Sequence, residues 1–210
     1  MKKINICCMM CMLMLGIGGC SWKQNQDMAE HSESFFAMDT YMTFTAYGAD
    51  AEPAVLAAQD KIRELEELWS FTDKNSDVYA VNHSSGQTVT VDWKTAELLS
   101  YALDMAEETN GALEPTIYPV LTAWGFTTGE NRVPAETELA ELLEKVGYDK
   151  VELNNDQIQM EPGGMIDLGA VGKGYAGDEA AQILRERGIT AALLDIGGKI
   201  QAIGTTPDGS

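Results

Sequence analysis

The sequence predicts an α+β protein in which helices pack against mixed or antiparallel sheets. Three observations support this fold class. The strand and helix signals follow one another in an irregular order, which is not the strict alternation of a parallel α/β fold. The chain has 210 residues, enough for one large domain or two small ones. Hydrophobic residues make up 45% and charged residues 22% of the chain, which is an ordinary globular balance.

Two helices carry the clearest signals. Residues 51–69 place one apolar stripe at helical spacing, which predicts a helix packed on a core. A second helix is expected over residues 93–109, because Asp92 can cap its first turn and Asn110-Gly111 can end it. The stripe of the first helix consists of Val55, Ala58, Ile62, Leu65 and Trp69.

The remaining elements are expected from shorter patterns. Alternating side chains predict a strand over residues 41–47, and Asn154-Asn155 suggests the turn of a hairpin spanning 151–160. Residues 70–87 are expected to form a loop with one helical turn near Tyr79. Further strands are expected at 88–91, 165–168, 191–196 and 199–203, and further helices at 135–146 and 173–187.

The N-terminal segment predicts export. Lys2 and Lys3 precede a mostly apolar run at residues 4–17, and Gly18-Gly19-Cys20 resembles a bacterial lipobox. We therefore expect a signal peptide at 1–19, a lipidated Cys20 and a polar tether at 20–36, followed by the domain at 37–210. The protein would then be lipid-anchored in the cell membrane, on its extracytoplasmic face. The alternative is a plain secretory signal in which Cys20 has no role.

Cysteine usage and charge exclude several functions. All four cysteines lie at or before position 20, so residues 21–210 can form neither a disulfide nor a cysteine-based zinc site. With only two histidines in the chain, a metal site would be rich in oxygen ligands, which favours Mg²⁺ or Ca²⁺. The formal net charge of −19 argues against broad nucleic-acid binding.

The most informative segment is the glycine-rich run from Asp167 to Asp178, between an expected strand and an expected helix. Glycines let a ligand approach the backbone, and Lys173 adds a cation. One interpretation is a dinucleotide fingerprint, since Gly172, Gly174 and Gly177 fit its spacing. A P-loop is excluded because glycine follows Lys173 where serine or threonine is required. The simplest alternative is a strand-to-helix turn with a solvated lysine.

The same run, Asp-Leu-Gly-Ala-Val-Gly-Lys-Gly-Tyr-Ala-Gly-Asp, resembles the signature of the ApbE family, the FAD:protein FMN transferases. Four other segments resemble the family in the same order, and the matches extend from about residue 37 to 204. In the first of them, Asp39 replaces the family's usual glycine. The four segments are Ala37-Met38-Asp39-Thr40, Ser76–Asn82, Asn110–Pro119 with Trp124-Gly125-Phe126, and Asp195–Gly198.

The resemblance implies a transferase with FAD as its substrate and Mg²⁺ as its metal ion. A Thr or Ser hydroxyl of an exported or membrane acceptor protein would attack the FMN-side phosphorus, and AMP would leave. Ala170 would ligate Mg²⁺ through its backbone carbonyl, and no catalytic residue is assigned. Glu114 replaces the usual aspartate, and Trp124 and Phe126 are expected to be core rather than flavin contacts. The implied FAD contacts are Met38, Thr72, Ala112, Leu113, Glu114, Asp167 and Lys173.

The family normally continues well beyond the length of this chain. We therefore expect a C-terminally truncated product, inactive by itself, whose remaining metal ligands lie beyond residue 210. Two other functions stay open at this point. One is an exported flavin-binding lipoprotein without catalysis, and the other is a Rossmann-type dinucleotide-binding protein.

Overall fold

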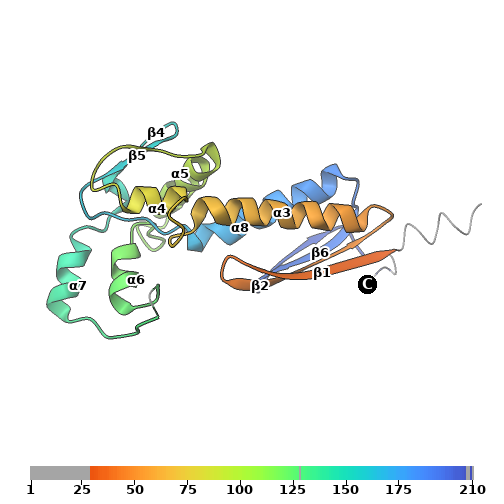
Figure 1. The fold of residues 1–210 in the computed structure, drawn as a ribbon, viewed down its shortest axis with the longest axis horizontal. Coiled ribbons are helices and arrows are strands. Elements are labelled where there is room, and N and C mark those ends of the chain that lie inside the picture. Colours follow the sequence, from red (N-terminus) through yellow and green to blue (C-terminus); the bar gives the residue numbers. More distant parts are fainter. Residues whose placement is uncertain (1–28, 128, 207–208, 210) are drawn as a thin grey trace, which may run out of the picture. The chain divides into compact units, whose positions relative to one another are not determined.

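The computed structural model describes residues 29–127, 129–206 and 209 (Figure 1). The described chain divides into two compact units. Of the described residues, the first unit contains 29–36, 40–59 and those from 180 onward, and the second contains 37–39 and those between 60 and 179. The expected signal peptide and Cys20 lie outside the described residues. Within the described part of the chain, every helix is too short or too polar to cross a bilayer.

The first unit is built on a four-stranded sheet with the order β1-β2-β6-β7. Its strands are β1 (Glu30–Ala37), β2 (Thr40–Tyr47), β6 (Ala191–Ile196) and β7 (Lys199–Ile203). The pairs β2–β6 and β6–β7 are antiparallel, with Phe44 opposite Leu194. Both of these side chains are fully buried, so alternate residues of each strand face the core of this unit.

The tether predicted at 20–36 is wrong for residues 30–36, because Glu30–Ala37 forms β1. The Ser32 and Ser34 hydroxyls hydrogen-bond those of Thr45 and Thr43, at 2.8 and 2.9 Å. On the other face of the strand, the Phe35 ring meets Phe44 edge-on, with 5.1 Å between centroids. The two serines therefore belong to the exposed face of a strand, whereas Glu33 lies on the same face as Phe35 and is only partly exposed.

The second unit combines helices with a three-stranded sheet in the order β3-β5-β4. Its core contains fully buried Leu98, Leu99, Ile158 and Ile166. The residues of α3 and of α8 are divided between the two units. The elements are α3 (Ala51–Trp69), α4 (Asp77–Asn82), β3 (Val89–Thr90), α5 (Trp93–Glu108), α6 (Tyr118–Trp124), α7 (Glu136–Leu143), a 3₁₀ turn (Tyr148–Lys150), β4 (Val151–Asn154), β5 (Gln157–Met160) and α8 (Gly169–Glu186).

Several local predictions are confirmed. Helix α3 has the predicted bounds, and four of its five stripe residues are fully buried. The Asp92 carboxylate accepts a hydrogen bond from the Lys94 N–H at 2.9 Å and caps α5. Asn110 and Gly111 follow the end of α5 with φ of 52° and 79°. A short helix, α4, contains Tyr79.

Other local predictions are wrong. Residues 165–168 form no strand, and α8 begins at Gly169 rather than at Lys173, so the first glycines of the run lie inside a helix. The hairpin turns at Asn155-Asp156, one residue later than predicted, where Asn155 has φ 56°. Helix α7 is shorter than expected, and β1 and α6 were not predicted.

Candidate functional site

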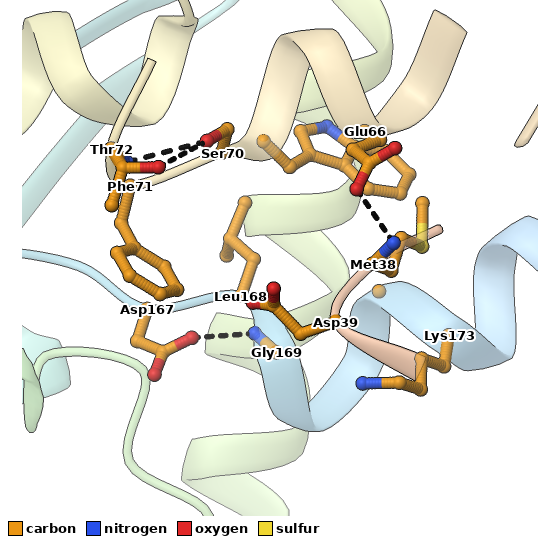
Figure 2. Close-up of a pocket in the computed structure, with 12 residues that line it drawn as sticks. Met38, Asp39, Glu66, Ser70, Phe71, Thr72, Asp167, Leu168, Gly169 and Lys173 are labelled. Atoms are coloured by element: carbon orange, nitrogen blue, oxygen red, sulfur yellow. Dashed lines mark hydrogen bonds between the residues drawn. The ribbon is translucent and has the colours of Figure 1, made fainter. Parts of the chain in front are cut away.

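A pocket of about 230 Å³ lies within the second unit (Figure 2). Three segments of the chain line it. The first is the turn at Met38-Asp39, the second is the end of α3 with the loop that follows it, residues 66–72, and the third is the segment 167–173 at the start of α8. These segments are far apart in sequence, so only the fold brings them together.

The first wall is a turn with an unusual backbone. Met38 and Asp39 have φ of 50° and 57°, in the left-handed region that residues other than glycine and asparagine rarely adopt. The Met38 N–H donates a hydrogen bond to Oε1 of Glu66, at 2.7 Å. Figure 2 shows this bond crossing from the turn to α3.

The second wall follows the end of α3. The Ser70 hydroxyl accepts hydrogen bonds from the N–H groups of Thr72 and Asp73, at 3.3 and 3.1 Å, which fixes a tight loop. The Phe71 ring packs against the ring of Tyr118 at a tilt, with 5.6 Å between the centroids. Burial raises the pKa of Tyr118 above its ordinary value, so this hydroxyl stays protonated at neutral pH.

The third wall is the segment 167–173, in which both the backbone N–H and the carboxylate of Asp167 make hydrogen bonds. The Asp167 N–H donates to the Pro115 carbonyl at 2.7 Å, and the Asp167 carboxylate accepts from the Gly169 N–H, also at 2.7 Å. The carboxylate therefore satisfies a free N–H group in the first turn of α8. Lys173 lies one turn further along the helix and is partly buried. It is thus the fifth residue of α8 and not, as the sequence suggested, the first.

The structure brings together four of the seven implied FAD contacts, namely Met38, Thr72, Asp167 and Lys173. The segment Ala112–Glu114 does not line this pocket. The Glu114 carboxylate instead accepts hydrogen bonds from the N–H and hydroxyl of Thr116, at 2.9 and 2.7 Å, and from the Tyr148 N–H, at 3.1 Å. This carboxylate braces two loops of the second unit.

The pocket has an uneven charge. Among the described residues that line it, Lys173 supplies the positive charge, whereas Asp39, Glu66 and Asp167 carry carboxylates. Two of these carboxylates accept hydrogen bonds from backbone N–H groups, those of Met38 and Gly169. Lys173 is therefore the group in this pocket that can neutralise an anionic ligand.

The described residues do not by themselves form a complete Mg²⁺ site. Ala170, the residue implied to ligate the metal, lies exposed in the first turn of α8. Across the described ranges, no three His, Cys, Asp or Glu residues gather in a way that could hold a metal ion. Mg²⁺ prefers six oxygen ligands in octahedral geometry, so the described residues supply at most a part of its coordination.

Sequence reasoning did not assign Glu66, Ser70 or Phe71 to the site, although all three line the pocket. Trp69, expected only as a core residue of α3, lines it as well. Glu66 has the same local setting as Glu64 and Glu67, so no helical pattern distinguishes it. Phe126 was expected in the core, but its side chain is 68% exposed and stacks on Trp124, with ring centroids 6.3 Å apart. Phe126 is therefore not a core residue, Trp124 is partly buried, and neither residue lines the pocket.

Comparison with known proteins identifies the class to which this fold and site belong. The ApbE family profile matches residues 38–210, and the chain belongs to this family. Both the resemblance noted in the sequence and the α+β fold are thereby confirmed. The dinucleotide-fold alternative is wrong, because residues 161–168 form no strand leading into the glycine-rich helix and the strand pairs of β6 are antiparallel rather than parallel.

Individual relatives agree with the family assignment. The chain is 28% identical, over 94% of its length, to the FAD:protein FMN transferase of Treponema pallidum, of which it covers 56%. It is 25% identical, over 82% of its length, to the enzyme of the same name from Escherichia coli, of which it covers 52%. The chain thus spans about half the length of these curated relatives.

Solved structures show the same fold. The ApbE protein of Thermotoga maritima superposes with a TM-score of 0.80 and 30% identity, over 87% of this chain and 61% of that protein. The flavin transferase ApbE of Vibrio cholerae superposes with a TM-score of 0.79 and 25% identity, over 86% and 61% of the two chains.

Proposed function

We propose that the protein acts as an FAD:protein FMN transferase, moving FMN from FAD to a Thr or Ser of an acceptor protein with release of AMP. The observation that carries the proposal is the pocket, in which Met38, Thr72, Asp167 and Lys173 converge from three distant segments. The relatives named FAD:protein FMN transferase support the same reaction.

The pocket suits one part of FAD rather than the whole molecule. Its volume of about 230 Å³ is below the roughly 300–1,000 Å³ of pockets that enclose a drug-sized ligand. Phe71, Leu168 and Met38 offer an apolar lining, whereas Lys173 offers an ammonium group. A ring system and an adjacent phosphate match these two kinds of surface.

The reaction exchanges one phosphorus–oxygen bond for another. The acceptor hydroxyl oxygen forms a bond to the FMN-side phosphorus and releases its proton to solvent. The bond from this phosphorus to the bridging oxygen breaks, and AMP leaves with that oxygen. Negative charge on the phosphoryl oxygens is the main barrier, and positioned cations and hydrogen-bond donors lower it. In this pocket Lys173 would stabilise that charge, and Asp167 would keep the start of α8 in place through Gly169.

Dependence on Mg²⁺ is part of the proposal on the strength of the resemblance alone. When bound, a divalent cation would supply Lewis-acid stabilisation of the phosphoryl oxygens. The Ala170 carbonyl is the ligand that the resemblance places in this chain. A transfer reaction that proceeds equally well with EDTA and with Mg²⁺ would remove this part of the proposal and leave the flavin chemistry in place.

We also propose that Cys20 is lipidated and anchors the protein to the extracytoplasmic face of the cell membrane. The support is the order of lysines, apolar run and Gly-Gly-Cys in the sequence. Intact-mass analysis of membrane fractions should show loss of residues 1–19 and addition of a diacylglyceryl group. A soluble product with an unmodified Cys20 would contradict the anchor.

The function is tested by separating binding from transfer. The full chain is titrated with FAD and, in parallel, with NAD⁺, and the heat of binding of each is measured by calorimetry. It is then incubated with FAD, Mg²⁺ and a Thr-containing acceptor protein that the Vibrio cholerae enzyme labels, with that enzyme as positive control. Covalent flavin is read by fluorescence in a denaturing gel, and AMP by chromatography.

The outcomes distinguish the candidate functions. Preferential FAD binding with labelled acceptor and free AMP supports the transferase. FAD binding without label or AMP shows that these 210 residues bind flavin without catalysis, as expected both for a flavin-binding lipoprotein and for a truncated transferase. Full-length relatives that label the acceptor under the same conditions then favour the truncated transferase. A chain that binds neither nucleotide, under conditions in which the control enzyme is active, contradicts both functions for these 210 residues.

A further inference from the structure

We propose that Glu66 is a positioning residue that holds Met38 in the pocket by fixing the turn between β1 and β2. This inference rests on the proposed function only for its ligand, FAD. Its structural basis is the hydrogen bond of 2.7 Å from the Met38 N–H to Oε1 of Glu66. Both residues line the same pocket, and both belong to the second unit.

The turn requires stabilisation by another part of the chain, because its two residues have an unfavourable backbone conformation. Only Met38 and Asp39 separate Ala37, the last residue of β1, from Thr40, the first of β2, and both have positive φ. Two-residue hairpin turns of this geometry favour Asn-Gly, because a side chain with a Cβ is strained in the left-handed region. Met38 has no side-chain group that could compensate as asparagine does.

Glu66 is well placed to stabilise the turn through its hydrogen bond to Met38. It is carried by α3, where its neighbours Ile62 and Leu65 are fully buried, so the helix at this point cannot shift easily. Its ionised carboxylate makes a charge-assisted hydrogen bond, which is stronger than a bond between neutral groups. Glu67, the next residue on the helix, is exposed and serves as a matched comparison.

The bond also limits how Met38 can contact a ligand. Its N–H is already committed to Glu66, so Met38 presents its side chain or its carbonyl to the pocket. The charge of Glu66 would by itself disfavour an anionic ligand, since Asp39 and Asp167 already outnumber Lys173. The acceptor role and the charge role of Glu66 therefore have opposite effects on FAD affinity, and Glu66→Gln separates them.

The first test needs no ligand. Hydrogen–deuterium exchange is measured on peptides covering residues 36–40 of the full chain. Glu66→Ala should accelerate exchange in these peptides, whereas Glu66→Gln, which keeps an acceptor oxygen, and Glu67→Ala should not. Unchanged exchange in Glu66→Ala would show that the bond does not hold the turn. If Glu66→Ala fails to fold, Glu66→Asp, which withdraws the carboxylate by one methylene, takes its place.

The second test measures FAD affinity by fluorescence titration of the same variants. Loss of one charge-assisted hydrogen bond should raise the Kd of Glu66→Ala about tenfold or more. Glu66→Gln should bind FAD at least as tightly as the unmodified chain. Adding Asp39→Gly to Glu66→Ala should restore more of the affinity than adding Asp39→Ala, because both changes remove the carboxylate and only glycine adopts a positive φ freely.

Contrary outcomes are equally clear. A Kd in Glu66→Gln that rises as much as in Glu66→Ala would assign the effect to charge and overturn the positioning role. Wild-type affinity in Glu66→Ala, together with faster exchange, would show that the turn does not matter for FAD. If the unmodified chain binds no FAD, the proposed function fails, while the exchange measurement still decides whether Glu66 holds the turn.

Discussion

The carboxamide of Asn82 hydrogen-bonds both backbone groups of Ile166, 84 positions away in the chain. Its Oδ1 accepts from the Ile166 N–H at 2.7 Å, and its Nδ2 donates to the Ile166 carbonyl at 3.0 Å. Asn82 is only 6% exposed, so water cannot replace these bonds easily. The Asn82 side chain therefore pairs with the N–H and carbonyl of Ile166 as the backbone of a neighbouring strand would, and this pairing fixes the backbone directly before Asp167.

Asn82→Ala should therefore be strongly destabilising. It leaves a buried N–H and a buried carbonyl without partners, which costs about 2–4 kcal/mol in the free energy of unfolding. The affinity for FAD should fall as well, because Asp167 follows Ile166 directly. Urea unfolding and FAD titration measure the two effects, with exposed Asn131→Ala as the control. A stability within 0.5 kcal/mol of the unmodified protein, a limit of about the size of an ordinary surface effect, would contradict this role.

Lys173→Met should weaken FAD binding by about ten- to a hundredfold, since a hydrogen bond to a charged group contributes about 1.5–3 kcal/mol. The reason is that Lys173 is the positive charge among three carboxylates in the described pocket. Titration with FAD measures the effect, and Lys74→Met, which removes an exposed lysine from the same unit, is the control. Equal affinities for FAD in the two variants would show that Lys173 does not contribute to FAD binding.

The regular elements were predictable where one signal dominated. Helix α3 has a continuous apolar stripe, and α5 has a capping aspartate at one end and Asn-Gly at the other, so their bounds follow from local chemistry. The start of α8 at Gly169 could not be predicted from local chemistry, because glycine disfavours helices. Tertiary burial outweighs that preference here, since Val171 and Ala176 are both buried.

The pocket was predictable only through family resemblance. Composition and spacing pointed to Lys173 and its glycines but not to the residues that face them. Met38 and Glu66 meet across 28 positions in the chain, and neither belongs to a pattern that requires the other. Contacts of this kind depend on how the loops are folded, which the local periodicity of a sequence does not record.

Glu64 should contribute a small, pH-dependent stabilisation. Its carboxylate lies 2.7 Å from Lys61 Nζ and 3.0 Å from Lys94 Nζ, and hydrogen bonds from these two lysines lower the pKa of Glu64 below its ordinary value of 4.5. Because the pKa is lower in the folded protein, the stabilisation is present above the unfolded-state pKa. It is lost as the pH falls through the lower pKa of the folded state.

Glu64→Gln should thus reduce the free energy of unfolding at pH 7 by less than about 1 kcal/mol, since the side chain is 46% exposed and screened by solvent. The difference from the unmodified protein should shrink as the pH is lowered below 4.5, and with added salt at pH 7. Urea unfolding at several pH values measures this, with exposed Glu67→Gln as the control. A difference that grows on acidification would contradict the sign of the pKa shift.

Glu114→Gln should affect stability more than FAD binding. The carboxylate accepts three hydrogen bonds, two from fully buried Thr116 and one from the Tyr148 N–H, and glutamine must turn a donor toward one of these groups. The free energy of unfolding should fall by about 1–3 kcal/mol. The Kd for FAD should change by less than about threefold, a factor that corresponds to well under 1 kcal/mol. Urea unfolding and FAD titration are compared with exposed Glu107→Gln. A tenfold loss of affinity with unchanged stability would instead favour a direct contact between Glu114 and the flavin nucleotide, as the family resemblance implies.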